Sequence, residues 1–457
     1  MLRQKILVFE HLLGIFFLLQ IIFPTFFTCN ITLISFATLI MAKYFLEGLR
    51  VTIFLIVFIQ TMLLCTSSIY IRLPLAFLMH LAIKYFPVYK YPEPLGKYKV
   101  GYKRIIIPNV TSIGVYYPTT QQTEDVHYAP DHTAWRRMAI FVRFIAELFG
   151  KPQIPVFLFK IALHFLEHQH LGVNRNAKIA KQGTSKFPSV VFSHGLSANI
   201  HIYSLHMKEW ASHGFIAFSV DHDEQIRLDA TKIKKYEDYV HLRSFHLEDR
   251  RNTIKKALDF ICNPSKIEEF FQDSQVALDY DNIFMSGHSL GGGTAAEIAL
   301  EDPRITGGLV LLDPWLDSCD VKSINNPINK PVLSIRSGEY EKMESTRACS
   351  VKHSKANSKD GLGLAGYFEE LSHNSFSDLP LLMPRELVLF KLMKGMNKLE
   401  EQAKYQTVLS RSFLEMALLH NRNPKGGKSL NVKTLTLKRF RDNLKELNVR
   451  DLFLIDE

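Results

Sequence analysis

A serine flanked by glycines at fixed spacing is the clearest catalytic signal in the chain, since residues 287–291 read Gly-His-Ser-Leu-Gly. An apolar stretch suited to a buried strand, residues 282–285, precedes this motif, and residues 292–300 can form a helix. Strand, sharp turn and helix together are typical of a nucleophile elbow, which presents the serine hydroxyl to a carbonyl carbon. The pattern therefore predicts Ser289 as a nucleophile, and the alternative is an ordinary glycine-rich loop.

The residues beside this serine have the types that such a turn requires. Chain and helix pass closely at an elbow, so the residues two before and two after the serine must be small, as Gly287 and Gly291 are. The N–H of Leu290 is then expected beside the reacting carbonyl, where it can stabilise a developing negative charge. His288 is expected to pack beside the turn rather than to act as a base.

An aspartate that follows a buried strand is the candidate to orient the base. A serine hydroxyl needs an imidazole to accept its proton and a carboxylate to orient that imidazole, in the chain order Ser, Asp or Glu, His. Asp313 directly follows the apolar residues 308–312. Asp317 and Asp320 compete with it but lie past the end of the expected strand. Asp313 could also be a strand-ending residue that caps the turn before Pro314.

Three histidines follow Asp313 and could supply the base. His353 lies in the Lys- and Ser-rich residues 350–360, which we interpret as an exposed loop. His420 ends a long predicted helix, where a cation is favourable for the helix dipole. His373 lies in a polar loop with one aromatic anchor, and its position makes it the preferred candidate.

A second donor for the developing negative charge is expected in a loop near the elbow. The residues Ser-His-Gly-Leu-Ser at 193–197 follow the predicted strand 190–192. Their His-Gly pair is typical of the loop that supplies a backbone N–H to the oxyanion. The donor would be the N–H of Leu196, with Gly195 allowing the backbone to turn that N–H inward. An ordinary strand-to-helix turn is the alternative.

The region that carries these residues alternates between apolar strands and helices. Such alternation predicts a mostly parallel sheet covered on both faces by helices. Two β segments are expected within residues 97–117. The later strands are expected at 190–192, 215–220, 283–286, 308–312 and 331–335, and helices at 203–213 and 239–260.

Two further helical segments have no assigned chemical role. Residues 135–168 show helical spacing of apolar side chains and could form a lid over the site or simply pack on the body. Residues 384–419 predict a long amphipathic helix or helix pair that packs on the body.

The first 90 residues differ in composition from the rest of the chain. Residues 12–42 and 51–71 carry no charged side chain, and the second stretch is long enough for one membrane-spanning helix. A cleaved secretory signal with Arg3 and Lys5 before its apolar part would explain the first stretch but not the second. The sequence therefore predicts an N-terminal membrane anchor of two to three helices, and the side of the membrane stays open.

The charge and the cysteine content of the chain bear on whether it binds lipid headgroups, nucleic acid or a metal. The net charge is +10, and residues 422–450 contribute nine Lys or Arg and two acids. This basic segment could lie against anionic lipid headgroups or be a solvated tail. It comes with no nucleic-acid recognition motif, so no nucleic-acid partner is predicted. The five cysteines have neither metal-ligand spacing nor a disulfide framework, and no metal or other cofactor is predicted.

The motifs taken together resemble a known family over roughly residues 98–382. The chain is similar to the platelet-activating factor acetylhydrolases of the plasma and intracellular type II kind, which are calcium-independent α/β-hydrolases acting on phospholipids. The matching segments are Phe-Ser-His-Gly-Leu at 192–196, Tyr-Ser at 203–204, Ala-Ser-His-Gly-Phe-Ile at 211–216, Val-Asp-His at 220–222, Gly-His-Ser-Leu-Gly-Gly at 287–292, Leu-Asp-Pro-Trp at 312–315 and His-x-x-Phe-x-Asp at 373–378.

The resemblance implies roles for the candidate residues. Ser289 would be the nucleophile, Asp313 the orienting acid and His373 the base, and the backbone N–H groups of Leu196 and Leu290 would form the oxyanion hole. Hydrolysis of a short or oxidised sn-2 acyl chain from a phospholipid, without a metal, is then expected. The hydrophobic N-terminus, the basic C-terminal extension and Leu290, where an aromatic residue is common, depart from the secreted members.

These observations predict a membrane-bound serine esterase with an α/β-hydrolase fold. The expected division is an anchor at 1–90, a catalytic domain at 91–420 and a basic extension at 421–457. One alternative is a general carboxylesterase or lipase, because an elbow does not fix the substrate. Another is a catalytically inactive membrane scaffold on a hydrolase fold.

Overall fold

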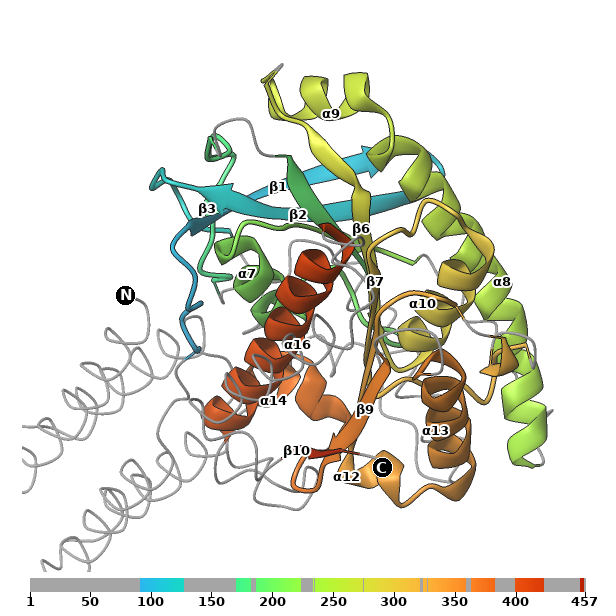
Figure 1. Ribbon diagram of the computed structural model, residues 1–457. Coiled ribbons are helices and arrows are strands. Elements are labelled where there is room, and N and C mark those ends of the chain that lie inside the picture. Colours follow the sequence, from blue (N-terminus) through green and yellow to red (C-terminus); the bar gives the residue numbers. More distant parts are fainter. Residues whose placement is uncertain are drawn as a thin grey trace, which may run out of the picture.

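The computed structural model describes residues 91–126, 170–181, 186–222, 233, 235–273, 275–320, 324–326, 328–358, 363–382, 399–422 and 453–455. These residues form a mixed sheet with helices on both of its faces (Figure 1). The order of the strands across the sheet is β10-β9-β8-β7-β6-β4-β5-β2-β1-β3. Their bounds are β1 Lys99–Ile107, β2 Thr111–Thr119, β3 Asn174–Arg175, β4 Phe187–Ser193, β5 Ile216–Val220, β6 Leu278–His288, β7 Gly308–Leu312, β8 Val332–Ser337, β9 Gly363–Phe368 and β10 Phe453–Ile455.

The central strands are parallel, as the alternation of strands and helices predicted. Pairing is parallel from β5 through β4, β6, β7 and β8 to β9, whereas β1 with β2, β2 with β5 and β9 with β10 are antiparallel. Ser193 of β4 pairs with Gly287 of β6, and His288 pairs with Leu312 of β7. The carboxyl ends of these three strands therefore meet at one edge of the sheet.

Alternating side chains along the central strands bury two separate cores. Val190 and Phe192 of β4 contribute to the core beneath α7 (Ser204–Ser212) and α16 (Leu399–Arg422). Val191, between them, contributes to the opposite core beneath α8 (Tyr236–Ile261) and α10 (Leu290–Glu301). This alternation follows from the two-residue period of a strand, and each fully buried large apolar side chain contributes about 1.5–3 kcal/mol.

Shorter elements complete the edge of the sheet where the strand ends meet. They are α12 (Gly338–Glu341), the 3-10 helix η3 (His373–Phe376) and α14 (Leu379–Leu382). The helix α13 (Glu344–Ser358) comes between α12 and β9 in the chain, whereas α9 (Pro264–Phe271) lies near the start of β6, at the opposite end of the sheet (Figure 1). α12 follows β8 directly, and η3 comes shortly after β9. These short elements bring side chains from the second half of the chain toward the elbow.

The fold corrects the interpretation of residues 350–360 and places a short piece of the predicted extension in the sheet. Residues 350–358, interpreted as exposed loop, belong to α13, whose inner side is covered by the body. Residues 453–455 of the predicted basic extension form β10, which pairs with β9 at the edge of the sheet. The long predicted C-terminal helix is present as α16 from residue 399, while residues 384–398 lie outside the described part.

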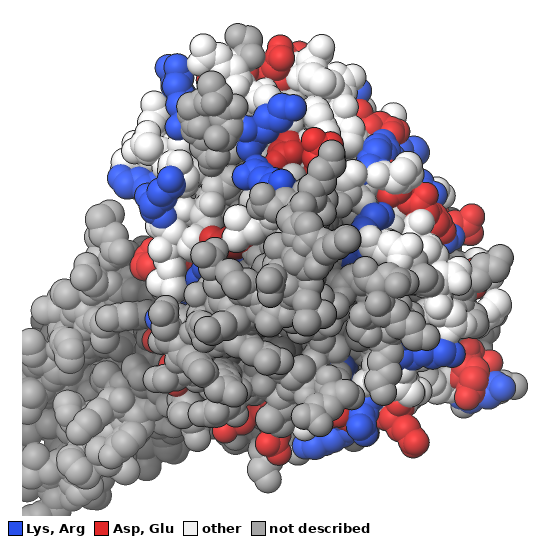
Figure 2. All heavy atoms as spheres, in the orientation of Figure 1, with Lys and Arg blue, Asp and Glu red and all other residues white. Residues whose placement is uncertain are grey.

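The predicted membrane anchor and the predicted helical segment 135–168 also fall outside the described residues. Within the described ranges, no helix combines the length and the apolar character that crossing a membrane requires. On the face shown in Figure 2, basic and acidic side chains of the described residues are interspersed.

Candidate active site

Ser289 stands at the turn between β6 and α10 in a backbone conformation that side chains rarely adopt. Its φ is 55° and its ψ is −123°. Such a conformation is costly and persists only where the surroundings enforce it. Its N–H donates to the carbonyl of Leu312 at 3.1 Å, and its carbonyl accepts from the N–H of Trp315 at 2.9 Å. The turn is thereby held to the end of β7, so the serine is fixed in place.

The two glycines of the motif are required by close backbone contacts, as the sequence predicted. A Cβ atom at Gly287 would lie 2.1 Å from the carbonyl oxygen of Gly291. A Cβ atom at Gly291 would lie 2.1 Å from the carbonyl oxygen of Ser193. Any larger residue at either position would therefore push the turn apart.

Asp313 lies directly after β7, fully buried, and both of its carboxylate oxygens accept hydrogen bonds. Oδ1 accepts from the N–H of Ser337 at 2.7 Å, and Oδ2 accepts from the Ser337 hydroxyl at 2.7 Å. Oδ2 also lies 2.7 Å from Nδ1 of His373. The competing Asp317 instead accepts from the Tyr236 hydroxyl and the indole N–H of Trp315. Of the three candidate acids, Asp313 is the one bonded to a candidate base.

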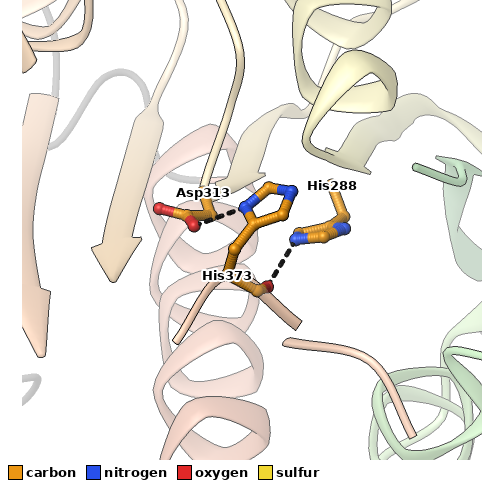
Figure 3. A group of neighbouring side chains, drawn as sticks. All are labelled: His288, Asp313 and His373. Carbon is orange, nitrogen blue, oxygen red and sulfur yellow. Dashed lines mark hydrogen bonds and ion pairs between the residues drawn. The ribbon is translucent and has the colours of Figure 1, made fainter. Parts of the chain in front are cut away.

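His373 begins η3 and has its ring oriented by several contacts. Because a carboxylate only accepts hydrogen bonds, the bond to Asp313 places a proton on Nδ1 and turns Nε2 away from the acid (Figure 3). The backbone N–H of His373 donates to Glu339 Oε2 at 2.8 Å. The Tyr340 ring stacks on the imidazole with centroids 4.4 Å apart and an interplanar angle of 12°.

Tyr340 lies beside both His373 and Ser289. Its hydroxyl oxygen is 3.5 Å from Nε2 of His373, and the Ser289 side chain lies near the same hydroxyl. Burial, together with the nearby charge of Asp313, raises the pKa of the Tyr340 hydroxyl well above its ordinary value. At neutral pH this tyrosine is therefore a neutral group beside the His373 ring.

The two other histidines considered for the base lie elsewhere in the fold. His353 is fully buried on α13, which corrects its interpretation as part of an exposed loop. His420 lies in the last turn of α16, where the sequence predicted it. Of the three histidines, His373 is the one whose ring donates a hydrogen bond to Asp313.

The burial of His353 predicts an acid-sensitive fold. Burial lowers the pKa of His353 from 6.5 to about 4, so the unfolded chain binds the proton more readily than the folded one. The free energy of unfolding should therefore fall between pH 6.5 and pH 4, by roughly 3 kcal/mol for this side chain. Urea unfolding of His353→Leu should show a weaker loss over this range, whereas His241→Leu, at an exposed position on α8, should keep the parent slope. An unchanged slope in His353→Leu would contradict the prediction.

His288 packs beside the turn, as predicted, and links the two loops of the site. Its Nε2 donates to the carbonyl of His373 at 3.0 Å, so its Nδ1 accepts from the Tyr203 hydroxyl at 2.8 Å (Figure 3). The Tyr203 hydroxyl in turn accepts from the N–H of Gly195 at 3.1 Å. Burial, together with the nearby His373, lowers the pKa of His288 well below its ordinary value, so the ring stays neutral.

The two candidate oxyanion donors belong to residues near the serine. Leu290 is the first residue of α10, so its N–H has no acceptor within the helix. Leu196 follows Gly195, where a Cβ atom would lie 2.7 Å from the Tyr203 hydroxyl and 3.6 Å from Cβ of Ser289. A glycine is therefore needed at position 195 because a Cβ atom there has no room beside the Tyr203 hydroxyl. The φ of Gly195 is not among the positive values found in the described residues, which corrects the expectation that glycine serves there to turn the backbone.

The side chains of His288, Asp313 and His373 are close enough together to hold a metal ion, but they are bound to other groups by hydrogen bonds. His288, Asp313 and His373 offer ligand atoms within 4.8 Å of one another, and within the described residues no other group of this kind is found. Nε2 of His288 and Nδ1 of His373 are each already engaged by an acceptor within the site. These side chains thus form an internal hydrogen-bond network.

Comparison with known proteins connects this geometry to a family. The family model described as platelet-activating factor acetylhydrolase, isoform II, matches residues 83–434. The chain belongs to this family. Membership makes the chain an ester hydrolase, the enzyme class that the sequence motifs predicted.

Relatives of this acetylhydrolase family are similar over part or most of the chain. The platelet-activating factor acetylhydrolase of Canis lupus familiaris is 25% identical over 335 residues, which cover 66% of this chain and 72% of the dog protein. The protein of the same name from Bos taurus is 28% identical over 184 residues, covering 34% of this chain and 41% of the bovine one. A ferulic acid esterase structure from Streptomyces cinnamoneus aligns with a TM-score of 0.49 and 16% identity, covering 74% of this chain and 94% of that one.

Sequence reasoning missed several residues that the fold brings to this candidate site. Ser337, Glu339 and Tyr340 lie at the end of β8 and in α12, where the sequence shows no motif. Arg250 is different, because it falls on the buried stripe of α8, with apolar side chains at Leu247 and Ile254 on the same face. A charged residue within an apolar stripe is a signal that could have found it.

Proposed function

We propose that the chain is a calcium-independent serine esterase with an α/β-hydrolase fold. It would hydrolyse the sn-2 acyl ester of phospholipids that carry a short or oxidised chain. The observation that supports this most directly is the hydrogen bond between Asp313 and His373 at the strand end to which the strained Ser289 is held by its backbone. Nucleophile, base and orienting acid are the groups that acyl transfer needs.

The proposed reaction proceeds through an acyl-enzyme. His373 Nε2 accepts the proton of Ser289 as its oxygen attacks the ester carbonyl, and the N–H groups of Leu196 and Leu290 stabilise the oxyanion. The imidazolium, stabilised by Asp313, then delivers the proton to the departing lyso-lipid oxygen. Water activated by His373 hydrolyses the acyl-enzyme and releases the fatty acid.

Tyr340 is expected to assist this reaction in two separable ways. Its ring packs against the imidazole, and its hydroxyl lies 3.5 Å from Nε2 of His373 and near Ser289. Tyr340→Phe keeps the ring and removes one neutral hydrogen-bonding group, so kcat/KM should fall by no more than about tenfold. Tyr340→Leu also removes the stacked ring and should lose more activity in the same assay. Equal losses in the two variants would contradict a separate role for the ring.

The surroundings of the serine favour an apolar acyl group. Leu290 belongs to a cluster with Leu247 and Trp315, and Leu196 and Tyr340 pack against this cluster. Both proposed oxyanion donors therefore belong to residues whose side chains lie among apolar neighbours. The printed name of the relatives, platelet-activating factor acetylhydrolase, supports a phospholipid as the molecule that carries the acyl group.

A lipid panel on the purified full-length protein tests this proposal. Phosphatidylcholines with acetyl, short oxidised and long sn-2 chains are compared in one assay, with and without a calcium chelator. Preference for the short or oxidised chains, unchanged by the chelator, is expected. Equal hydrolysis of simple esters and long-chain lipids would indicate a general carboxylesterase or lipase. Absence of both hydrolysis and fluorophosphonate labelling in folded protein would indicate an inactive scaffold.

We further propose that residues 1–90 anchor this catalytic domain, at 91–420, in a membrane. The support comes from the two uncharged stretches at 12–42 and 51–71, and from the basic segment 422–450, which could contact anionic headgroups. The full chain should stay in the membrane fraction after alkaline carbonate washing, whereas a chain starting at residue 91 should be released. Release of the full chain would argue against the anchor.

A further inference from the structure

Arg250 is a buried cation whose guanidinium lies directly behind the loop that carries Leu196. The side chain projects from α8 and is 1% exposed. Its Nη1 donates to the carbonyl of His194 at 2.6 Å, and its Nη2 donates to the carbonyl of Gly195 at 3.4 Å. Arginine remains charged at any physiological pH, so two consecutive carbonyls of this loop face a permanent positive charge.

The contacts of Gly195 fix the orientation of the peptide that contains the Leu196 N–H. The Gly195 carbonyl accepts from Arg250, from Nδ1 of His194 at 2.7 Å and from the N–H of Ala198 at 3.2 Å. The peptide bonds of the described residues include no cis bond, so C=O and N–H of this unit point in opposite directions. The N–H of Leu196 is therefore directed away from Arg250.

This loop also passes close to Ser289. A Cβ atom at Gly195 would lie 3.6 Å from Cβ of Ser289. The N–H of Gly195 is held by Tyr203, whose hydroxyl also bonds His288 of the elbow. Arg250 therefore contacts the same short loop that passes close to Ser289.

We propose that Arg250 is a positioning residue that holds the Leu196 N–H toward the oxyanion and strengthens it as a donor. This inference rests on the proposed serine esterase function and deepens it. A charge-assisted bond to a carbonyl polarises the peptide unit, which makes the N–H at its other end more positive. Because negative charge develops on the substrate oxygen in the transition state, the contribution of Arg250 is realised mainly there.

The test separates transition-state stabilisation from binding and from folding. Arg250→Met removes the charge and both donors, and Arg250→Lys keeps the charge with a single donor centre. Arg251→Met is the matched control, because Arg251 is the next residue of α8 and pairs with Glu301 at the surface. For each full-length variant we measure kcat, KM, the melting temperature and two affinities. One is for a trifluoromethyl ketone, which forms a tetrahedral adduct, and the other is for an uncleavable ether analogue of the substrate.

Arg250→Met should lower kcat by about 100-fold, the scale of losing one oxyanion donor, with KM and ether affinity changed by less than about threefold. The ketone affinity should fall in proportion to kcat/KM, Arg250→Lys should be intermediate, and Arg251→Met should match the parent. A folded Arg250→Met with parent kcat would overturn the inference, as would equal losses of ketone and ether affinity. If Arg250→Met does not fold, Arg250→Lys carries the same comparison. If neither folds, Arg250 is a structural residue and the inference fails.

Failure of the inference can be told apart from failure of the proposed function. A parent enzyme that hydrolyses lipid esters and is labelled by a fluorophosphonate, beside an Arg250→Met variant of equal kcat, rejects the inference alone. A parent enzyme that is neither labelled nor active rejects the serine mechanism itself.

Discussion

Replacement of Ser289 by alanine is expected to lower kcat for ester hydrolysis at least about 10⁴-fold, because the attacking oxygen is lost. The fold should survive, since the contacts that hold the turn to Leu312 and Trp315 are made by the backbone of residue 289. Alanine is also smaller than serine and fits the same space. Steady-state hydrolysis of a short-chain phospholipid and labelling by a fluorophosphonate measure the effect.

Ser286 supplies the matched control for that experiment. It lies on the same strand, three residues before the elbow, and its buried hydroxyl donates to the carbonyl of Val310 at 2.7 Å. Ser286→Ala should cost about 1 kcal/mol of unfolding free energy and keep both labelling and turnover. Parent-level hydrolysis by Ser289→Ala, or labelling that persists without this hydroxyl, would remove Ser289 from the mechanism.

Asp313→Asn is expected to reduce kcat by about 10⁴-fold while leaving the geometry almost unchanged. The asparagine oxygen can still accept from Ser337, which turns the amide N–H₂ toward Nδ1 of His373. Nδ1 must then accept, so the ring proton moves to Nε2. With Nε2 protonated, His373 cannot take the proton of Ser289.

Asp317→Asn distinguishes this role from that of the nearest competing acid. Asp317 accepts from Tyr236, Trp315 and Thr346, so its replacement should affect the stability of this loop and leave kcat within a few-fold of the parent. Turnover and melting temperature are measured for both variants under the same conditions. The opposite pattern, with kcat lost in Asp317→Asn and kept in Asp313→Asn, would make Asp317 the orienting acid.

The central sheet was predictable because its strands are buried on both faces. The strand Gly308–Leu312 is apolar throughout and is followed by the polar Asp313. Even the bounds of this strand could therefore be predicted from the sequence. The helix Glu344–Ser358 was not predictable, since its polar composition lacks the apolar repeat of an amphipathic helix. β10 pairs with β9 across a separation of about ninety residues, and such long-range pairing leaves no local pattern.

The candidate site was predictable where a motif coincides with a strand end. Ser289 and Asp313 follow β6 and β7 directly, and chain order then favours His373 among the later histidines. Tyr340 and Arg250 were missed because their roles depend on which loops the fold brings to them. A tyrosine or an arginine in a helix has no local feature that shows which backbone it will contact.

The backbone hydrogen bonds from residue 289 to Leu312 and Trp315 hold one part of the site, the turn after β6 and the end of β7, in a fixed arrangement. The proposed nucleophile, Ser289, and the proposed acid, Asp313, are attached to the same pair of adjacent strands, so substitutions that shift one would shift the other. Residues of α8 and α12, such as Leu247 and Tyr340, contact the same site without sharing those bonds. Variation in acyl-chain preference, by natural divergence or by directed evolution, should therefore accumulate on α8 and α12 and spare the elbow.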